Sequence, residues 1–307
     1  MNEKIRQYRE EITARLADAL EKGKAPWQKP WNGERMPHNA VTGRKYSGSN
    51  AVVLALIGLE LDDGKNPRWM TFNQARAKGW SVRKGEHGTR ISFWKNFETP
   101  IEGADGEPLL DKDGKPITKN ILMEKLFTIF HASQIEGIPA YSPTPINAVE
   151  ANEKAERIIA DSGADIRHEG FRAFYSPGED CVRLPGPEFF MDTASYYATA
   201  LHELTHWTGH GSRLGRNLDG EKGSPSYARE ELAAEIGSMF VSAETGIPQT
   251  EEHFKNHAAY VGGWISLLKS DPDALFKAAS DANKAAEFLL KKERERAQEQ
   301  DGEEQAA

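Results

Sequence analysis

The stretch His202-Glu203-Leu204-Thr205-His206 decides how this sequence is interpreted. On a helix, residues four apart lie on one face, so both imidazoles can reach one metal ion. Glu203 then lies beside the open coordination position, where it can take a proton from metal-bound water as a general base. Zinc lowers the pKa of such water to about 7 and thereby supplies a nucleophile at neutral pH. The alternative interpretation is a pair of exposed helical histidines without a metal.

A catalytic zinc site needs a third protein ligand. In one known spacing a third histidine follows a glycine, and Gly209 matches that glycine, but Ser212 occupies the histidine position. His210 lies four residues after His206, yet it falls at the expected end of the helix between two glycines. The residues that follow His206 are therefore unpromising candidates for the third ligand.

A carboxylate from a later helix is the better candidate. The segment 229–235, Arg-Glu-Glu-Leu-Ala-Ala-Glu, belongs to a predicted helix over 227–244 and carries three glutamates. We expect Glu231 to be the third ligand and Glu235, on the same face, to accept a ring N–H from one histidine and orient it. Glu230 is the weakest of the three, and all three can also be read as ordinary surface glutamates. The donor set favours Zn²⁺, although two histidines and a carboxylate also accept manganese or cobalt.

The sequence does not identify the group that would stabilise the oxyanion formed when water attacks a peptide carbonyl. Tyr227, His253 and His257 are candidates because they can donate hydrogen bonds. Two short strands are expected near 166–175 and 180–184, and the edge near 174–184 can pair with an extended peptide.

Charge is segregated along the chain. The net charge is −8 over 307 residues, but residues 1–97 hold 18 Lys and Arg against 10 Asp and Glu, while the remainder holds 21 against 37. Five of the seven tryptophans also fall in the basic third. This asymmetry indicates two parts with different partners. No run of 18 apolar residues and no apolar leader occurs, so we expect a cytoplasmic protein without a membrane span.

Aromatic and basic residues interleave in the N-terminal third, a pattern typical of proteins that bind single-stranded nucleic acid. Cations follow the phosphates and rings stack on unpaired bases. Trp27 and Trp31, in a proline-rich loop, are the better exposed candidates, and individual aromatics can equally belong to a core. The candidate DNA-binding residues are Trp27, Trp31, Arg44, Lys45, Tyr46, Arg68, Trp69, Arg83 and Lys84.

The patterns predict an α+β protein of two domains. We expect a first domain over 1–137, with residues 98–120 as an exposed insertion or hairpin, and a linker over 138–146. The metal-binding domain is expected over 147–290. The charged tail 291–307 has no apolar face and is expected to be disordered.

Several longer motifs resemble antirestriction proteins of the ArdC type. They are Pro26-Trp27 with Pro30-Trp31, the segment 37–50 (PHNAVTGRKYSGSN), 67–75 (PRWMTFNQA), 82–89 (VRKGEHGT), 201–210 (LHELTHWTGH) and 227–232 (YAREEL). The resemblance covers about residues 3–290, and its N-terminal part is also similar to the corresponding region of plasmid conjugation primases.

The resemblance implies a domain that binds single-stranded DNA joined to a zincin-like metallopeptidase domain. Such proteins are encoded on conjugative plasmids and protect incoming DNA from restriction. It also implies that His202, His206 and Glu231 hold the metal, with Glu203 as the base. The expected partners are single-stranded DNA and a host protein substrate. Two alternatives remain: a DNA-binding protein whose metal site is structural or vestigial, and a peptidase whose basic domain recognises an acidic protein.

Overall fold

The computed structural model describes residues 2–27, 36–103, 106–143, 147–248 and 251–306. The N-terminal part contains α1 (Glu3–Glu21), β1 (His38–Asn39), α2 (Gly48–Asp62), β2 (Arg68–Met70), α3 (Phe72–Ala77), β3 (Ser81–Val82), β4 (Thr89–Pro100), β5 (Thr118–His131), the 3₁₀ turn η1 (Ala132–Gln134) and β6 (Ile135–Glu136). The C-terminal part contains α4 (Ala148–Ser162), β7 (Asp165–His168), β8 (Phe174–Ser176), β9 (Cys181–Leu184), η2 (Pro187–Phe189), α5 (Thr193–Trp207), α6 (Pro225–Thr245), α7 (Glu251–Ser270) and α8 (Ala274–Ala306). The predicted α+β class with two domains is confirmed.

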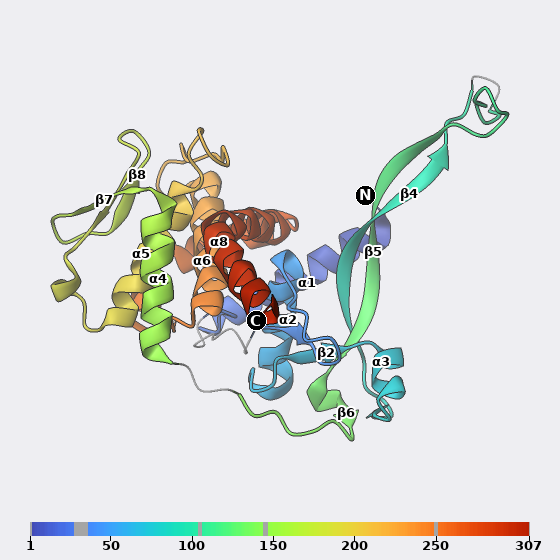
Figure 1. Cartoon of the computed structure of the whole chain (residues 1–307), viewed down its shortest axis with the longest axis horizontal. Helices are drawn as coiled ribbons and strands as arrows, with labels where there is room; N and C mark the ends of the chain where they lie inside the picture. Colours follow the sequence, from blue (N-terminus) through green and yellow to red (C-terminus); the bar gives the residue numbers. More distant parts are fainter. Residues whose placement is uncertain (1, 28–35, 104–105, 144–146, 249–250, 307) are drawn as a thin grey trace.

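The N-terminal part is built on a four-stranded sheet in the order β1-β2-β5-β4. β4 and β5 pair in antiparallel register over their full length, from Thr89 opposite Ile129 to Pro100 opposite Thr118. Only the base of this pair is covered by helices, and the rest extends from the body as a two-stranded arm (Figure 1). The predicted hairpin over 98–120 is therefore the outer end and tip of the arm.

The C-terminal part places a small sheet beside a bundle of helices. The sheet has the order β7-β9-β8, so β8 is an edge strand. α5 begins at the N-cap Asp192, whose side chain accepts a hydrogen bond from the backbone N–H of Ser195. α6 begins after the N-cap Ser224, with Pro225 in its first turn, and ends at Gly246 in the left-handed region. These two helices carry His202, His206 and Glu231, the residues predicted to hold a metal.

The two domains share one hydrophobic core. Tyr8, Ile12, Leu16 and Leu20 of α1 are buried together with the apolar helix α2 and with residues of α5, α6 and α8. Trp27 of the first domain packs edge-on against Trp264 of α7, with the ring centroids 5.7 Å apart. Arg9 of α1 binds Asp273 just before α8, with Nη1 2.8 Å from Oδ1. The domains are thus held together by apolar burial and by partly buried polar contacts.

The close approach of α5 and α6 depends on a glycine. A Cβ atom placed on Gly237 would lie 2.6 Å from Cγ2 of Thr205, closer than two carbon atoms can pack. Without that Cβ, α6 lies near enough to α5 for the hydroxyl of Ser238 to contact the carbonyl oxygen of Ala198 at 3.5 Å. Gly237 therefore sets the separation at which the glutamates of α6 face the histidines of α5.

The C-terminal tail differs from its prediction. α8 continues as a helix from Ala274 to Ala306, so the expectation of disorder over 291–307 is wrong for the residues that the structure describes. Glutamate, lysine, arginine, glutamine and alanine have high helix propensity, which the missing apolar face concealed. Ion pairs to α4 also fix this part of the helix: Glu293 binds Arg157 at 2.7 Å, and Arg296 pairs with Asp161.

Candidate metal centre

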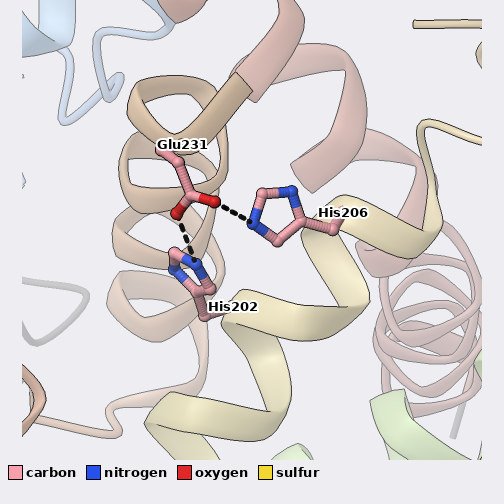
Figure 2. Close-up of side chains that lie close together, drawn as sticks. All are labelled: His202, His206 and Glu231. Atoms are coloured by element: carbon pink, nitrogen blue, oxygen red, sulfur yellow. Dashed lines mark ion pairs between the residues drawn. The ribbon is translucent and has the colours of Figure 1, made fainter. Parts of the chain in front are cut away.

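Two imidazoles and one carboxylate converge between α5 and α6. His202 and His206 lie one helical turn apart on the face of α5 that is turned toward α6, and their ring centroids are 4.9 Å apart. Glu231 of α6 lies between them. One carboxylate oxygen is 3.8 Å from Nε2 of His202 and the other is 3.8 Å from Nε2 of His206 (Figure 2).

These distances fit a shared metal ion. A contact of 3.8 Å is too long for a hydrogen bond, yet ligand atoms bound tetrahedrally at 2.0–2.2 Å from one ion are separated by about 3.3–3.6 Å. One ligand atom from each of the three residues lies within 4.8 Å of the others. Two neutral imidazole nitrogens and one carboxylate are also the donor set of a known class of catalytic zinc sites. The residues present therefore fit a divalent cation.

A second glutamate orients each histidine. Nδ1 of His202 lies 3.4 Å from Oε2 of Glu235, and Nδ1 of His206 donates a hydrogen bond of 3.0 Å to Oε1 of Glu230. Because the Nδ1 side of each ring faces a carboxylate, the Nε2 side is left for Glu231 and a metal. Glu230, which the sequence analysis ranked last of the three glutamates, thus contacts a predicted ligand directly.

Arg216 fixes the position of Glu230. Its guanidinium donates to both carboxylate oxygens, at 2.8 and 3.0 Å, and also to the carbonyl oxygen of Thr205 near the end of α5. Gly209 makes room for this side chain, since a Cβ there would lie 2.9 Å from Nη2 of Arg216. The loop after α5 therefore locks α5 and α6 together beside the site.

The charges of the site are mutually dependent. Burial alone would raise the pKa of Glu231, but the adjacent imidazoles of His202 and His206 hold that pKa well below its usual range. Burial likewise opposes ionisation of Glu230, whose pKa is nevertheless lowered by His206 and Arg216. Both carboxylates are consequently negative at neutral pH: Glu231 faces the two imidazoles, and the charge of Glu230 is paired with Arg216.

The centre lies in a cleft of about 820 Å³, which is also lined by Glu203. Its lining also includes Phe174 and Tyr175 of the edge strand β8, together with Tyr227 and Tyr260. Burial, together with Tyr260 and the nearby carboxylate of Glu231, raises the pKa of the Tyr227 hydroxyl far above its ordinary value. Burial also raises the pKa of Tyr260. Both phenols are therefore protonated hydrogen-bond donors at neutral pH.

Some candidate residues lie elsewhere. His210 does not belong to the group formed by His202, His206 and Glu231, and its Nδ1 lies 2.8 Å from the hydroxyl of Ser212. The side chains of His253 and His257 lie outside the described residues. Sequence reasoning missed Arg216 and Tyr260, because neither belongs to a recognisable spacing. The only available signal was their chemistry: an arginine after the metal helix, and a tyrosine on the helix that follows the glutamates.

The candidate DNA-binding residues differ in how far their side chains are exposed to solvent. Trp27 and Trp69 are each only 1% exposed, so the prediction that Trp27 is exposed is wrong: its ring is buried against Trp264. Trp31 lies outside the described residues. Tyr46 and Arg68 are partly buried, and Arg44, Lys45, Arg83 and Lys84 are exposed. Lys45 and Arg83 are paired with Glu244 and Glu86, respectively.

Comparison with known proteins identifies both domains. Residues 6–130 match the model of the N-terminal domain of anti-restriction factor ArdC, and residues 153–281 match that of a zincin-like metallopeptidase. The crystal structure of the antirestriction ArdC protein from plasmid R388 superposes with a TM-score of 0.72 in its metal-free form, at 35% identity over 92% of this chain and 96% of that one. Its Mn(II)-bound form gives a TM-score of 0.71 at 36% identity.

Two further relatives differ in length. The DNA primase TraC of Escherichia coli is 44% identical over 98% of this chain, but the chain spans only 28% of that protein's length. The uncharacterized protein y4eC of Sinorhizobium fredii is 33% identical over 91% of this chain and 90% of its own length.

Within the described residues, none of the helices combines the length and the apolar character needed to span a membrane.

Proposed function

This chain belongs to the ArdC antirestriction family, and we propose that it protects the DNA of a mobile element by two joined activities. The N-terminal domain binds single-stranded DNA without sequence preference, and the C-terminal domain cleaves a host protein with a metal-dependent peptidase site. Both act in the cytoplasm, where entering DNA meets host enzymes. The observation that carries the proposal is the shared cleft of Glu203 and the three metal-fitting side chains.

His202, His206 and Glu231 are the residues that would hold the metal. A divalent cation supplies there a Lewis acid that polarises a peptide carbonyl and makes water acidic enough to attack at neutral pH. Zinc suits this donor set, and the Mn(II)-bound relative supports manganese as a second possibility.

Glu203 acts as the general base and then as the acid. Its side chain is buried in the lining of the cleft, one residue after the proposed ligand His202, which puts it near the position that an attacking water would take. It takes the proton of that water and delivers it to the leaving amine. Tyr227 and Tyr260 donate hydrogen bonds toward the carbonyl oxygen as it becomes negative, a role that requires the protonated phenols described above.

The edge strand β8 supports a peptide as the substrate class. Among the described residues β8 pairs only with β9, which leaves its other edge available for main-chain hydrogen bonds along the cleft. Phe171 and Phe189 pack edge-on at 5.3 Å in the lining of the same cleft and remain largely exposed. They offer an apolar surface to side chains of an extended substrate.

A transfer experiment with matched variants tests the proposal. A plasmid expressing this chain is conjugated into a restricting recipient, and Glu203→Ala, His206→Ala and the surface control Glu221→Ala are compared with the unmodified chain. We expect Glu203→Ala to retain metal by elemental analysis yet lose protection, and His206→Ala to lose both. The control should protect fully.

Two results would contradict parts of the proposal. Full protection by Glu203→Ala with its metal retained would mean that the metal site is structural and that DNA binding alone protects. A gel shift with single-stranded DNA, duplex and an acidic polypeptide tests the other half. Preference for the acidic polypeptide, or binding that does not weaken with salt, would exclude the phosphate-dominated contact proposed here.

A further inference from the structure

The arm formed by β4 and β5 has two chemically different faces. In an antiparallel pair, directly opposed residues project to the same side and alternate along each strand. The opposed pairs Phe93 with Lys125, Lys95 with Met123, Phe97 with Ile121, and Thr99 with Lys119 therefore share one face with Phe127, which is opposite Ile91. We call the residues Phe93, Lys95, Phe97, Lys119, Ile121, Met123, Lys125 and Phe127 the Phe–Lys face.

Ring and cation contacts support this assignment. The rings of Phe93 and Phe127 meet edge-on with centroids 5.4 Å apart. Nζ of Lys125 lies 4.2 Å above the ring of Phe97, and Nζ of Lys95 lies 5.6 Å from the same centroid. Aromatic rings and ammonium groups thus alternate on one continuous surface.

Near the base of the arm, residues of the opposite face contact the helices of the body. Glu124 binds Nη2 of Arg9 on α1 at 2.6 Å, and its side chain is only 6% exposed. Both backbone groups of Ser92 bond the side-chain amide of Asn50 on α2, and Leu126 packs against the main core. These contacts fix the orientation of the arm and leave the Phe–Lys face outside.

The exposure of the Phe–Lys face is unusual for its composition. Phe93, Met123 and Phe127 are each 46% exposed, and Ile121 is 36% exposed. Large apolar side chains gathered on one exposed surface mark an interaction site rather than a folding requirement. The face carries three lysines and no carboxylate, although the whole chain is acidic. The missing partner must therefore be both anionic and able to contact flat rings.

We propose that the Phe–Lys face is the surface on which this protein binds single-stranded DNA. The inference rests on the proposed function and assigns the DNA to residues that the interleaved tryptophans of the sequence did not indicate. Unpaired bases stack on Phe93 and Phe127, and Lys95, Lys119 and Lys125 neutralise the phosphates between them. The contact is independent of base identity because every base offers a π-face.

The chemistry favours a single strand over other occupants. In duplex DNA the base faces are stacked inside, so they cannot meet exposed phenylalanines. A second copy of this chain, docked symmetrically through the same face, would bring six lysines together without a compensating carboxylate on that face. The arm also projects at the opposite end of the molecule from β7, β8 and α5, so DNA on it leaves the metal cleft open (Figure 1).

Fluorescence anisotropy with labelled oligothymidine tests the proposal on the full chain. The ring variants are Phe93→Ala and Phe127→Ala, and the charge variant combines Lys95→Ala, Lys119→Ala and Lys125→Ala. Leu122→Ala is the matched apolar control because Leu122 is 57% exposed on the opposite face, and Lys112→Ala at the tip is the charge control. Circular dichroism of each variant verifies that the fold is retained.

We expect each ring variant to weaken binding at least about 5-fold. A plot of the logarithm of the association constant against the logarithm of the salt concentration has a negative slope. The triple lysine variant should make this slope less steep by about 2, since each lost phosphate contact on a single strand removes about 0.7. Both controls should bind like the unmodified chain. Unchanged binding by the ring and lysine variants would overturn the assignment while leaving single-stranded DNA binding intact.

Two other outcomes count against the assignment in a distinguishable way. If the unmodified chain sediments as a dimer that Phe127→Ala dissociates without weakening DNA binding, the face is a self-association surface. If the unmodified chain fails to bind oligothymidine at low salt, both this assignment and the DNA half of the proposed function are wrong.

Discussion

Nδ1 of His206 donates a hydrogen bond to Oε1 of Glu230 at 3.0 Å, which leaves Nε2 of the same ring facing Glu231. The contact links the two helices of the site through one imidazole. Arg216 completes it by binding Glu230 from the other side. The orientation of a metal-fitting histidine is therefore set by residues that do not themselves face the metal.

Replacing Glu230 should weaken metal binding without removing a ligand. In Glu230→Gln the charged acceptor of the His206 ring is lost and Arg216 is left without its counter-charge. We expect a 10- to 100-fold loss of affinity for Zn²⁺, the usual effect of losing such an orienting group. Competition with a chromophoric chelator measures it, with Glu221→Gln as the surface control. Equal affinities for the two variants would contradict the positioning role of Glu230.

A methyl group on Gly237 should push α5 and α6 apart. We expect Gly237→Ala to lower the free energy of unfolding by about 1–3 kcal/mol, as overpacking in a core does. Urea unfolding measures this loss. Thr205→Ser in the same chain removes Cγ2, the atom that the new Cβ would meet, and should restore at least half of it. Gly262→Ala is the matched helical control, because nothing lies within 4 Å of its Cβ position. Because alanine has a higher helix propensity than glycine, Gly262→Ala should not lose stability, and a loss as large as that in Gly237→Ala would contradict the packing explanation.

Acidification should destabilise the first domain through His131. This ring is fully buried, Nε2 bonds the carbonyl oxygen of Asn66, and Nδ1 accepts from the backbone N–H of Ser133. Burial lowers the pKa of His131 below the ordinary histidine value of 6.5. The unfolded chain therefore binds the proton first, so stability is retained above about pH 6.5 and falls as the pH decreases below it.

Urea unfolding between pH 5 and 7.5 tests this dependence, with His131→Gln as the comparison. The variant should be less stable at pH 7.5 but should lose less stability on acidification than the unmodified chain. Parallel pH profiles for the two proteins would assign the acid sensitivity to other groups.

Chelation should lower the melting temperature of the metal-loaded protein. An ion present at 1000 times its dissociation constant stabilises the folded state by about 4 kcal/mol, which corresponds to a shift of roughly 10 °C for a domain of this size. Differential scanning fluorimetry with EDTA, followed by added Zn²⁺ or Mn²⁺, measures the loss and its recovery. His206→Ala should show no shift. A melting temperature unaffected by EDTA, with stoichiometric ion removed, would show that the site contributes nothing to folding.

Local patterns carried much of the prediction. The helix predicted over 227–244 corresponds to α6, because apolar spacing and helix-ending residues act within a few residues. The i, i+4 spacing of His202 and His206 fixes their common face in the same way. Glu231 was chosen on the assumption that its face of the helix is turned toward the two histidines. The structure brings His202, His206 and Glu231 together.

Other predictions failed where distant contacts decide. Composition suggested an exposed Trp27, but the ring fills a space against Trp264, more than 200 residues away along the chain. The tail was expected to be disordered because it lacks an apolar face, yet its charges pair with Arg157 and Asp161 on α4. The Phe–Lys face could not be predicted from the sequence, because its composition depends on the register between β4 and β5.

By itself, the sequence determined the helices, the metal-binding motif and the division into a basic and an acidic part, since these follow from residue type and short spacing. Only the tertiary structure decided which glutamate faces which imidazole, how Arg216 closes the site, and which aromatic rings remain outside. These outcomes depend on helix separation and strand register, which arise from packing between segments far apart in the chain and leave no local trace in it.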